Sequence, residues 1–181
     1  MKLLQPVILL TLTFFMSAFV LRAQDAALDE TDVQATYKAS YLFNFAKYCD
    51  WPEEYKKVDF VIAVAGNSGV LKELQDKYKG KRIGNQVIDV KELKLNEKVG
   101  YPVHILYVSR SASKDLLSYI KTFKKFPTMI VSEQDTALDS GSFINFKAVD
   151  AVIKFEINDT RAKEAGVLIG DILKGWALNI K

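Results

Sequence analysis

The chain has 181 residues, of which 49% are hydrophobic and 26% are charged, and its formal net charge is +3. This composition is that of a folded globular protein and excludes a disordered chain. A chain of this length is expected to form one domain that buries enough surface to fold without disulfide or metal staples.

Residues 1–23 have the pattern of a secretory signal peptide. Lys2 provides the positive end, the run from Leu3 to Leu21 is mostly apolar, and Ala23 is a small residue at a plausible cleavage point. The alternative is a membrane anchor, because the run approaches the roughly 20 residues that a membrane span needs. Cleavage would leave residues 24–181 as a single periplasmic domain. Without Lys2 and Arg22 its net charge is +1, which gives no reason to expect a nucleic-acid partner.

The stretch Ala35–Pro52 (ATYKASYLFNFAKYCDWP) predicts an aromatic amphipathic helix. At 100° per residue one stripe collects four aromatic side chains, those of Tyr37, Tyr41, Phe45 and Tyr48. Lys38 is alone within the apolar half. Pro52 disfavours a helical conformation at Trp51, so the helix is expected to end near that residue.

This aromatic stripe has two interpretations. It is expected to pack into the core, and the alternative is a surface for a partner or for a second copy of the chain, where Tyr and Trp are favoured residue types. Asn44 and Trp51 are the candidate partner-binding residues, because each brings a polar atom to an apolar edge.

The remaining elements alternate between strands and helices. Apolar or alternating runs predict strands at residues 58–65, 86–93, 103–108 and 127–131 and a hairpin-like pair at 142–146 and 151–157. Helices are predicted at 70–78, from Ser111 or Ser113 to about Lys125, from Asn158 or Asp159 to Gly166, and after Gly170, the last with core anchors at Ile172, Leu173, Trp176 and Ala177. This pattern indicates an α/β layered domain, with a mainly parallel sheet flanked by helices and an antiparallel pair near the C-terminus.

Motifs of catalysis and metal binding are missing from the sequence. It has no G-x-S-x-G, H-E-x-x-H, C-x-x-C or P-loop. His104, the single histidine, begins a buried strand and is interpreted as a satisfied core residue. Cys49, the single cysteine, is interpreted as a buried inert thiol, with an intermolecular bridge as the alternative. We therefore expect a protein that is not an enzyme and uses no cofactor or metal.

A candidate ligand site lies where the strands of such a sheet end. Ligands of open α/β sheets bind beyond the carboxyl ends of the strands, and helix N-termini there suit an anion. The candidate ligand-binding residues are Gly66, Asn67, Ser109, Arg110, Ser111, Ser132 and Glu133. The alternative is that these segments are ordinary capped connections.

The order of several segments resembles the YfiR-like family of periplasmic proteins. The resemblance rests on the opening Y-x-x-x-Y-L-F-N-F-A-K-Y-x-x-W-P and on the later segments FVIAVAG, HILYVS, PTMIVSE, GSFINF and FEIN…A..AG..I…L, which together span residues 37–173. It implies a secreted α/β domain that dimerises. The best-known members bind the periplasmic part of a membrane diguanylate cyclase and hold it inactive, which represses cyclic-di-GMP signalling and biofilm formation.

One feature departs from the pattern of that family. Members under redox control carry cysteine pairs, whereas this chain has only Cys49, so disulfide-gated regulation is not carried over. The resulting hypothesis is a non-enzymatic regulator that inhibits a membrane signalling protein such as a diguanylate cyclase, with a possible small-molecule signal. The alternative is a periplasmic small-molecule binding protein that uses the crevice at the carboxyl ends of the strands.

Overall fold

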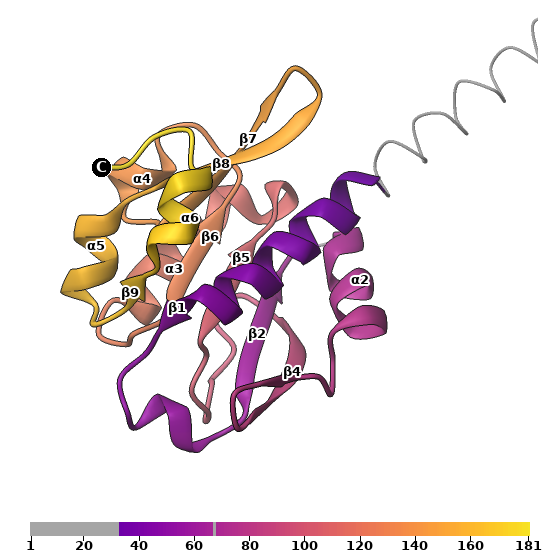
Figure 1. The fold of residues 1–181 in the computed structure, drawn as a ribbon, viewed down its shortest axis with the longest axis vertical. Helices are drawn as coiled ribbons and strands as arrows, with labels where there is room; N and C mark the ends of the chain where they lie inside the picture. Colours follow the sequence, from indigo (N-terminus) through magenta and orange to yellow (C-terminus); the bar gives the residue numbers. More distant parts are fainter. Residues whose placement is uncertain (1–32, 67) are drawn as a thin grey trace, which may run out of the picture. The chain divides into compact units, whose positions relative to one another are not determined.

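The computed structural model describes residues 33–66 and 68–181 (Figure 1). The predicted leader, residues 1–23, and the candidate ligand residue Asn67 lie outside the described residues. The compact unit runs from Ala35 to Lys181.

A seven-stranded sheet forms the centre of this unit, in the order β3–β4–β2–β5–β6–β7–β8. Strands β4, β2, β5, β6 and β7 are parallel neighbours, while β3 and β8 pair antiparallel at the two edges. A separate antiparallel pair joins β1 to β9. The α/β class with a mainly parallel sheet and an antiparallel pair near the C-terminus is confirmed. The bounds are β1 Cys49–Asp50, β2 Phe60–Ala65, β3 Arg82–Ile83, β4 Gln86–Leu93, β5 Ile105–Val108, β6 Met129–Ser132, β7 Ile144–Val149, β8 Val152–Ile157 and β9 Leu168–Ile169.

The central strands are apolar because both faces of the sheet are covered. Every residue of β2, β5 and β6 is buried. Strand β4, nearer the edge, alternates between buried and partly exposed positions, as its sequence pattern predicts. The chain leaves β2 for β4 on one side and then returns to β5 on the other, so the strand order reverses at the β2–β5 pair.

Each face of the sheet has its own set of helices (Figure 1). The N-terminal helix, residues 33–48, lies over one face, and it shares a hydrophobic cluster there with α2, α5 and α6. The short helix η2 and α3 share the cluster on the other face. The bounds are η1 Tyr55–Lys57, α2 Gly69–Lys77, η2 Arg110–Asp115, α3 Leu116–Phe123, α4 Ala137–Ser140, α5 Asp159–Glu164 and α6 Asp171–Trp176.

The N-terminal helix packs through a narrower stripe than the aromatic pattern predicts. Its buried residues are Ala35, Ala39, Leu42, Phe45 and Ala46. Small alanines let the helix approach the sheet closely, and Tyr37 is left 57% exposed. The helix also ends at residue 48, earlier than predicted, because Cys49–Asp50 leaves it to pair with Leu168–Ile169.

Two expectations about the later helices are wrong in detail. The segment after β5 starts as the 3-10 helix η2 and becomes α-helical only at Leu116, so neither Ser111 nor Ser113 caps α3. In α6 only Leu173 is buried, whereas Ile172 and Trp176 are about half exposed and Ala177 is partly buried just after the helix ends. A helix of six residues presents too few positions to bury all four anchors.

Candidate functional site

The carboxyl ends of β2 and β5 are packed against each other. Gly66 follows β2 with a φ of +87°, and a Cβ built on it would lie 2.5 Å from Ser109 Oγ and 2.7 Å from Ser111 Oγ. Those two hydroxyl oxygens are 2.9 Å apart, within hydrogen-bond distance. The position therefore requires glycine, because a side chain would enter the space that these hydroxyls occupy.

An open hollow of about 490 Å³ lies beside this contact. Gly66 and Ser111 line it, but the exposed Arg110 and the residues Ser132 and Glu133 do not. Its charged lining groups are the acids Glu92 and Asp115 and the single cation Lys94. The structure thus brings together only some of the predicted ligand residues, and the predicted anion site there remains a prediction.

The end of β6 is occupied by contacts within the protein. Ser132 Oγ donates to Asn145 Oδ1 at 3.0 Å, and Lys38 Nζ of the N-terminal helix lies 2.6 Å from Glu133 Oε2. Both side chains of this ion pair are nearly buried. Desolvation raises the pKa of Glu133 above its ordinary value, and the ammonium of Lys38 offsets part of that rise. Lys38, isolated in the apolar half of the helix sequence, thus fastens the helix to the end of β6.

The amino end of the sheet holds His104, which is fully buried. The backbone N–H of Val61 donates to His104 Nδ1 at 3.1 Å, so Nε2 carries the proton and lies 2.9 Å from the carbonyl oxygen of Tyr55. Desolvation lowers the pKa of the imidazole. His104 is therefore neutral, has a fixed tautomer and is satisfied within the core, as its sequence position predicts.

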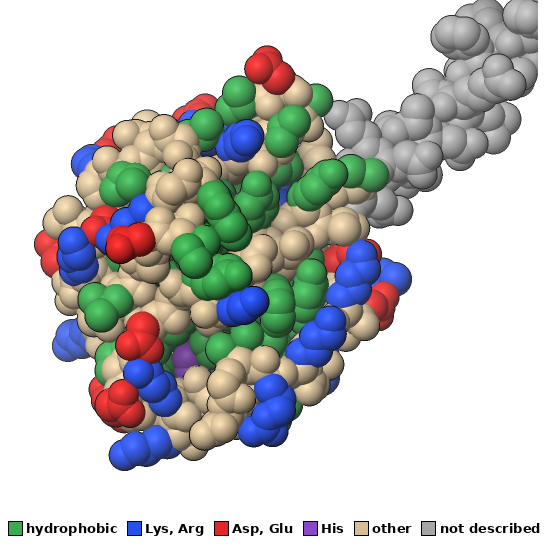
Figure 2. Space-filling model, viewed as in Figure 1, with side chains coloured by type: hydrophobic (Ala, Val, Ile, Leu, Met, Phe, Trp, Pro, Cys, Tyr) green, Lys and Arg blue, Asp and Glu red, His purple; other side chains and the backbone are tan. Residues whose placement is uncertain are grey.

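A partly exposed aromatic surface joins the N-terminal helix to α6, and we call it the aromatic face. Its members are Tyr37, Tyr41, Asn44, Tyr48, Ile172 and Trp176. Tyr48 meets Trp176 edge to face with ring centroids 5.9 Å apart, and Trp176 is 47% exposed. Figure 2 shows hydrophobic side chains gathered across the same region of the molecule.

The two predicted partner-binding residues have different environments. Asn44 is partly exposed and lies on the helix between Tyr41 and Tyr48, within the aromatic face. Trp51 is only 5% exposed, and its Nε1 donates to the carbonyl oxygen of Pro127 at 2.9 Å. Trp51 therefore presents little surface to a partner in this conformation.

The described part of the chain, residues 33–66 and 68–181, lacks the side-chain clusters that bind metals. It contains no group of three His, Cys, Asp or Glu side chains placed to hold a metal ion. None of its helices is long and apolar enough to cross a membrane. Cys49 is partly buried, and desolvation raises the pKa of its thiol to about 12, so it is protonated at neutral pH.

Comparison with known protein families identifies the chain. Residues 35–173 match the sequence model of the family described as YfiR/HmsC-like, which spans nearly all of the compact unit. The chain belongs to the YfiR/HmsC-like family. No curated protein matches it at a significant level.

The aromatic face of this YfiR/HmsC-like protein was found only in part from sequence. The helix pattern identified Tyr37, Tyr41 and Tyr48 but assigned them first to the core. Ile172 and Trp176 were assigned to the core as well, because the sequence after Trp176 has no Gly or Pro to show that α6 ends there and stays short. Residues 48 and 176 meet through a long-range contact that no local pattern reports.

Proposed function

We propose that this protein is a non-enzymatic periplasmic regulator that binds the periplasmic part of a membrane diguanylate cyclase and holds it inactive. Membership of the YfiR/HmsC-like family supports the regulatory role. The structural observation that carries the proposal is the aromatic face, where Tyr37 and Trp176 keep about half of their surface in water.

The aromatic face has the properties of a protein-binding surface. Tyrosine and tryptophan rings supply large contact areas and dominate the energetics of many interfaces. One ring of the face is held in place by the core, because Tyr41 lies edge to face on the buried Phe155 at a centroid distance of 5.2 Å, and its hydroxyl donates to the carbonyl oxygen of Ile153. Together with the contact between Tyr48 and Trp176, this leaves a partner fewer side chains to order on binding.

The regulatory mechanism would be a shift of populations. A protein that binds the inactive conformation of the cyclase more tightly than the active one lowers the active fraction. The ratio of the two affinities sets the size of this shift. A signal that weakens this contact would release the enzyme. The family resemblance also favours a homodimer, and the aromatic face of a second copy is a competing occupant of the same surface.

The proposal is tested by capture from membranes and by cyclic-di-GMP in cells. The protein is used to capture its partner from detergent-solubilised membranes of its own host, and we expect a membrane diguanylate cyclase with a periplasmic region to be recovered. Trp176→Ala and Tyr37→Ala should each weaken capture about 10-fold or more, as for interface hot spots, and should raise cellular cyclic-di-GMP. Asn44→Ala should have a smaller effect in the same direction.

A matched control is Leu117→Ala, which removes an exposed apolar side chain from α3 on the other face of the sheet. This variant should capture the cyclase as well as wild type does. If wild type and the three aromatic-face variants capture the cyclase equally well, the aromatic face is not the contact. The proposed regulatory function is wrong if the folded wild-type protein captures no membrane signalling protein and deletion of its gene leaves cellular cyclic-di-GMP unchanged.

A further inference from the structure

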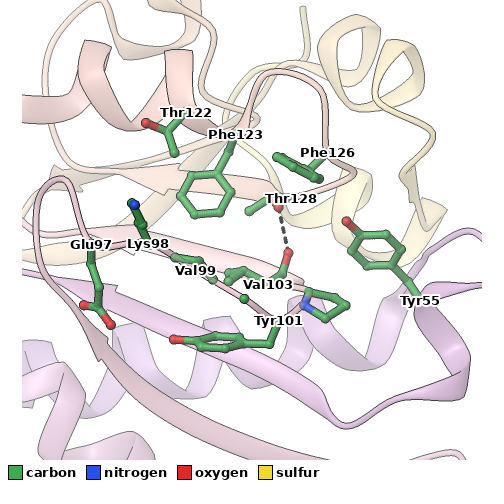
Figure 3. Close-up of a pocket in the computed structure, with 12 residues that line it drawn as sticks. Tyr55, Glu97, Lys98, Val99, Tyr101, Val103, Thr122, Phe123, Phe126 and Thr128 are labelled. Carbon is green, nitrogen blue, oxygen red and sulfur yellow. Dashed lines mark hydrogen bonds between the residues drawn. The ribbon is translucent and has the colours of Figure 1, made fainter.

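A second hollow lies at the opposite end of the sheet from the predicted ligand crevice, and we call it the aromatic hollow. It has a volume of about 530 Å³ and is open on one side. Figure 3 shows it between the loop that precedes β5 and the C-terminal end of α3. Four aromatic side chains from three segments of the chain surround it, those of Tyr55, Tyr101, Phe123 and Phe126.

The floor of the aromatic hollow is fixed and its polar groups are paired. Val103 and Thr128 are each only 1% exposed. Thr128 Oγ1 donates to the carbonyl oxygen of Val103 at 2.7 Å, which joins the residues that precede β5 and β6. The backbone N–H of Met129 in turn donates to the carbonyl oxygen of His104 at 2.9 Å. These bonds hold the base of the hollow in place, so a ligand that contacts the rings around it need not reorganise the base.

Two of the four rings are open to solvent, since Phe126 is exposed and Tyr101 is partly exposed, whereas Tyr55 and Phe123 are buried behind them. Tyr101 and Phe123 lie below and above the space in Figure 3, and Phe126 is 50% exposed although its ring contacts that of Phe123. Lys91 Nζ lies 4.9 Å from the centroid of the Tyr101 ring, which holds that ring in place by a cation–π contact. A flat ring inserted among these side chains would gain stacked or edge-to-face contacts.

A cation at the mouth, Lys98, can meet an acidic substituent on such a ring. The two charged lining residues are Glu97 and Lys98. Glu97 Oε2 accepts a hydrogen bond from the backbone N–H of Lys94 at 3.0 Å. Figure 3 shows the carboxylate of Glu97 pointing away from Phe123 and Thr122. The ammonium of Lys98 lies on the side of the mouth nearest those two residues in the same view. A carboxylate at the edge of the hollow would meet this cation.

We propose that the aromatic hollow is a binding site for a small aromatic carboxylate, with the ring among Tyr101, Phe123 and Phe126 and the carboxylate at Lys98. The volume lies within the 300–1,000 Å³ typical of small-molecule sites. The proposal does not depend on the regulatory function, because the hollow shares no residue with the aromatic face.

The experiment titrates 2-naphthoate into protein produced from the full chain and follows backbone amide signals by NMR. We expect saturable shifts of residues 99–103 and 122–128 with a Kd of about 1 mM or tighter for a ligand of this size. Phe126→Ala should weaken binding about five-fold through the lost ring contact. Lys98→Gln should weaken 2-naphthoate binding about three-fold and leave binding of the uncharged 2-naphthylmethanol unchanged.

Leu117→Ala, on the same helix but outside the hollow, is the matched control and should bind 2-naphthoate as wild type does. Phe126 and Lys98 are exposed enough for both variants to fold, which the dispersion of their amide signals verifies. Absence of saturation at about 10 mM 2-naphthoate, or binding unchanged in Phe126→Ala, would overturn the site. Equal losses of the acid and the alcohol in Lys98→Gln would overturn the carboxylate specificity.

Discussion

The two ends of the central parallel strands are filled in opposite ways. At the carboxyl ends, the protein places its own polar groups: the hydroxyls of Ser109 and Ser111 close over Gly66, and Lys38 pairs with Glu133. At the amino ends a neutral imidazole is buried, and aromatic rings surround the aromatic hollow. A hollow is left at each end, of about 490 Å³ at the carboxyl ends and about 530 Å³ at the amino ends. Strand polarity therefore indicates where helix N-termini gather, but it does not decide which hollow is surrounded by aromatic rings.

The largest expected effect comes from a residue that supports the amino end. Trp51→Ala would remove a buried indole and its hydrogen bond to Pro127, one residue before the floor of the aromatic hollow, and should lower the free energy of unfolding by about 3–5 kcal/mol. Trp176→Ala, at a half-exposed position, should cost much less. Urea denaturation of both variants measures the difference, and equal losses would show that Trp51 does not belong to the core.

The carboxyl end can be tested through its glycine. Gly66→Ala should destabilise the protein by about 3 kcal/mol, because the new methyl group meets Ser109 and Ala112 in addition to the strain of a positive φ. The matched control is Gly80→Ala, with a φ of +81° and no heavy atom within 4 Å of the place that its methyl group would take, which should cost about 1 kcal/mol. If urea midpoints shift equally in the two variants, the carboxyl end is more open than described.

The amino end should lose stability in acid. Desolvation holds the pKa of His104 below its ordinary 6.5, so the unfolded chain binds a proton that the folded protein does not. The free energy of unfolding should therefore fall as pH drops below 6.5, by at most about 1.4 kcal/mol per pH unit. The fall between pH 7.5 and 5.5 should be weaker in His104→Asn than in wild type, and an unchanged slope in that variant would contradict the assignment.

The carboxyl end should respond to pH with the opposite sign and a smaller effect. The pKa of Glu133 is raised above its ordinary 4.5, so folding favours the protonated acid, and stability from this group is lost as pH rises past 4.5 toward the folded value. Ionised Glu133 keeps Lys38 as its partner, which limits the loss. Glu133→Gln should remove this component, seen as a steeper rise in stability from pH 4.5 to 6 than in wild type. The same slope in both proteins would show that the carboxyl group is not desolvated.

Sequence patterns predicted the elements that are defined locally. The run at 86–93 has the bounds of β4, Asn158 accepts the N–H of Arg161 as the cap of α5, and Gly166 ends that helix with a φ of +80°. These features depend on residues that are neighbours in the chain, so periodicity and capping rules identify them.

Long-range contacts account for what the sequence did not predict. The β1–β9 pair has two residues per strand and joins positions about 120 residues apart, so no periodicity marks it. The partner of Lys38 is 95 positions away. The aromatic hollow is lined by residues that lie far apart in the sequence, from Tyr55 to Thr128. The rule that ligands bind beyond the carboxyl ends of the strands predicted the opposite end of the sheet.

The protonated thiol of Cys49 has a practical consequence. A thiol reagent should modify it faster when β1 separates from β9, because desolvation raises its pKa to about 12 and keeps the reactive thiolate scarce while the pair is closed. With reagent in excess, the rate of labelling would measure how often β1 separates from β9, and no new cysteine would have to be introduced. The same labelling rate, measured in the presence of a bound partner, would show whether binding at the aromatic face slows that opening.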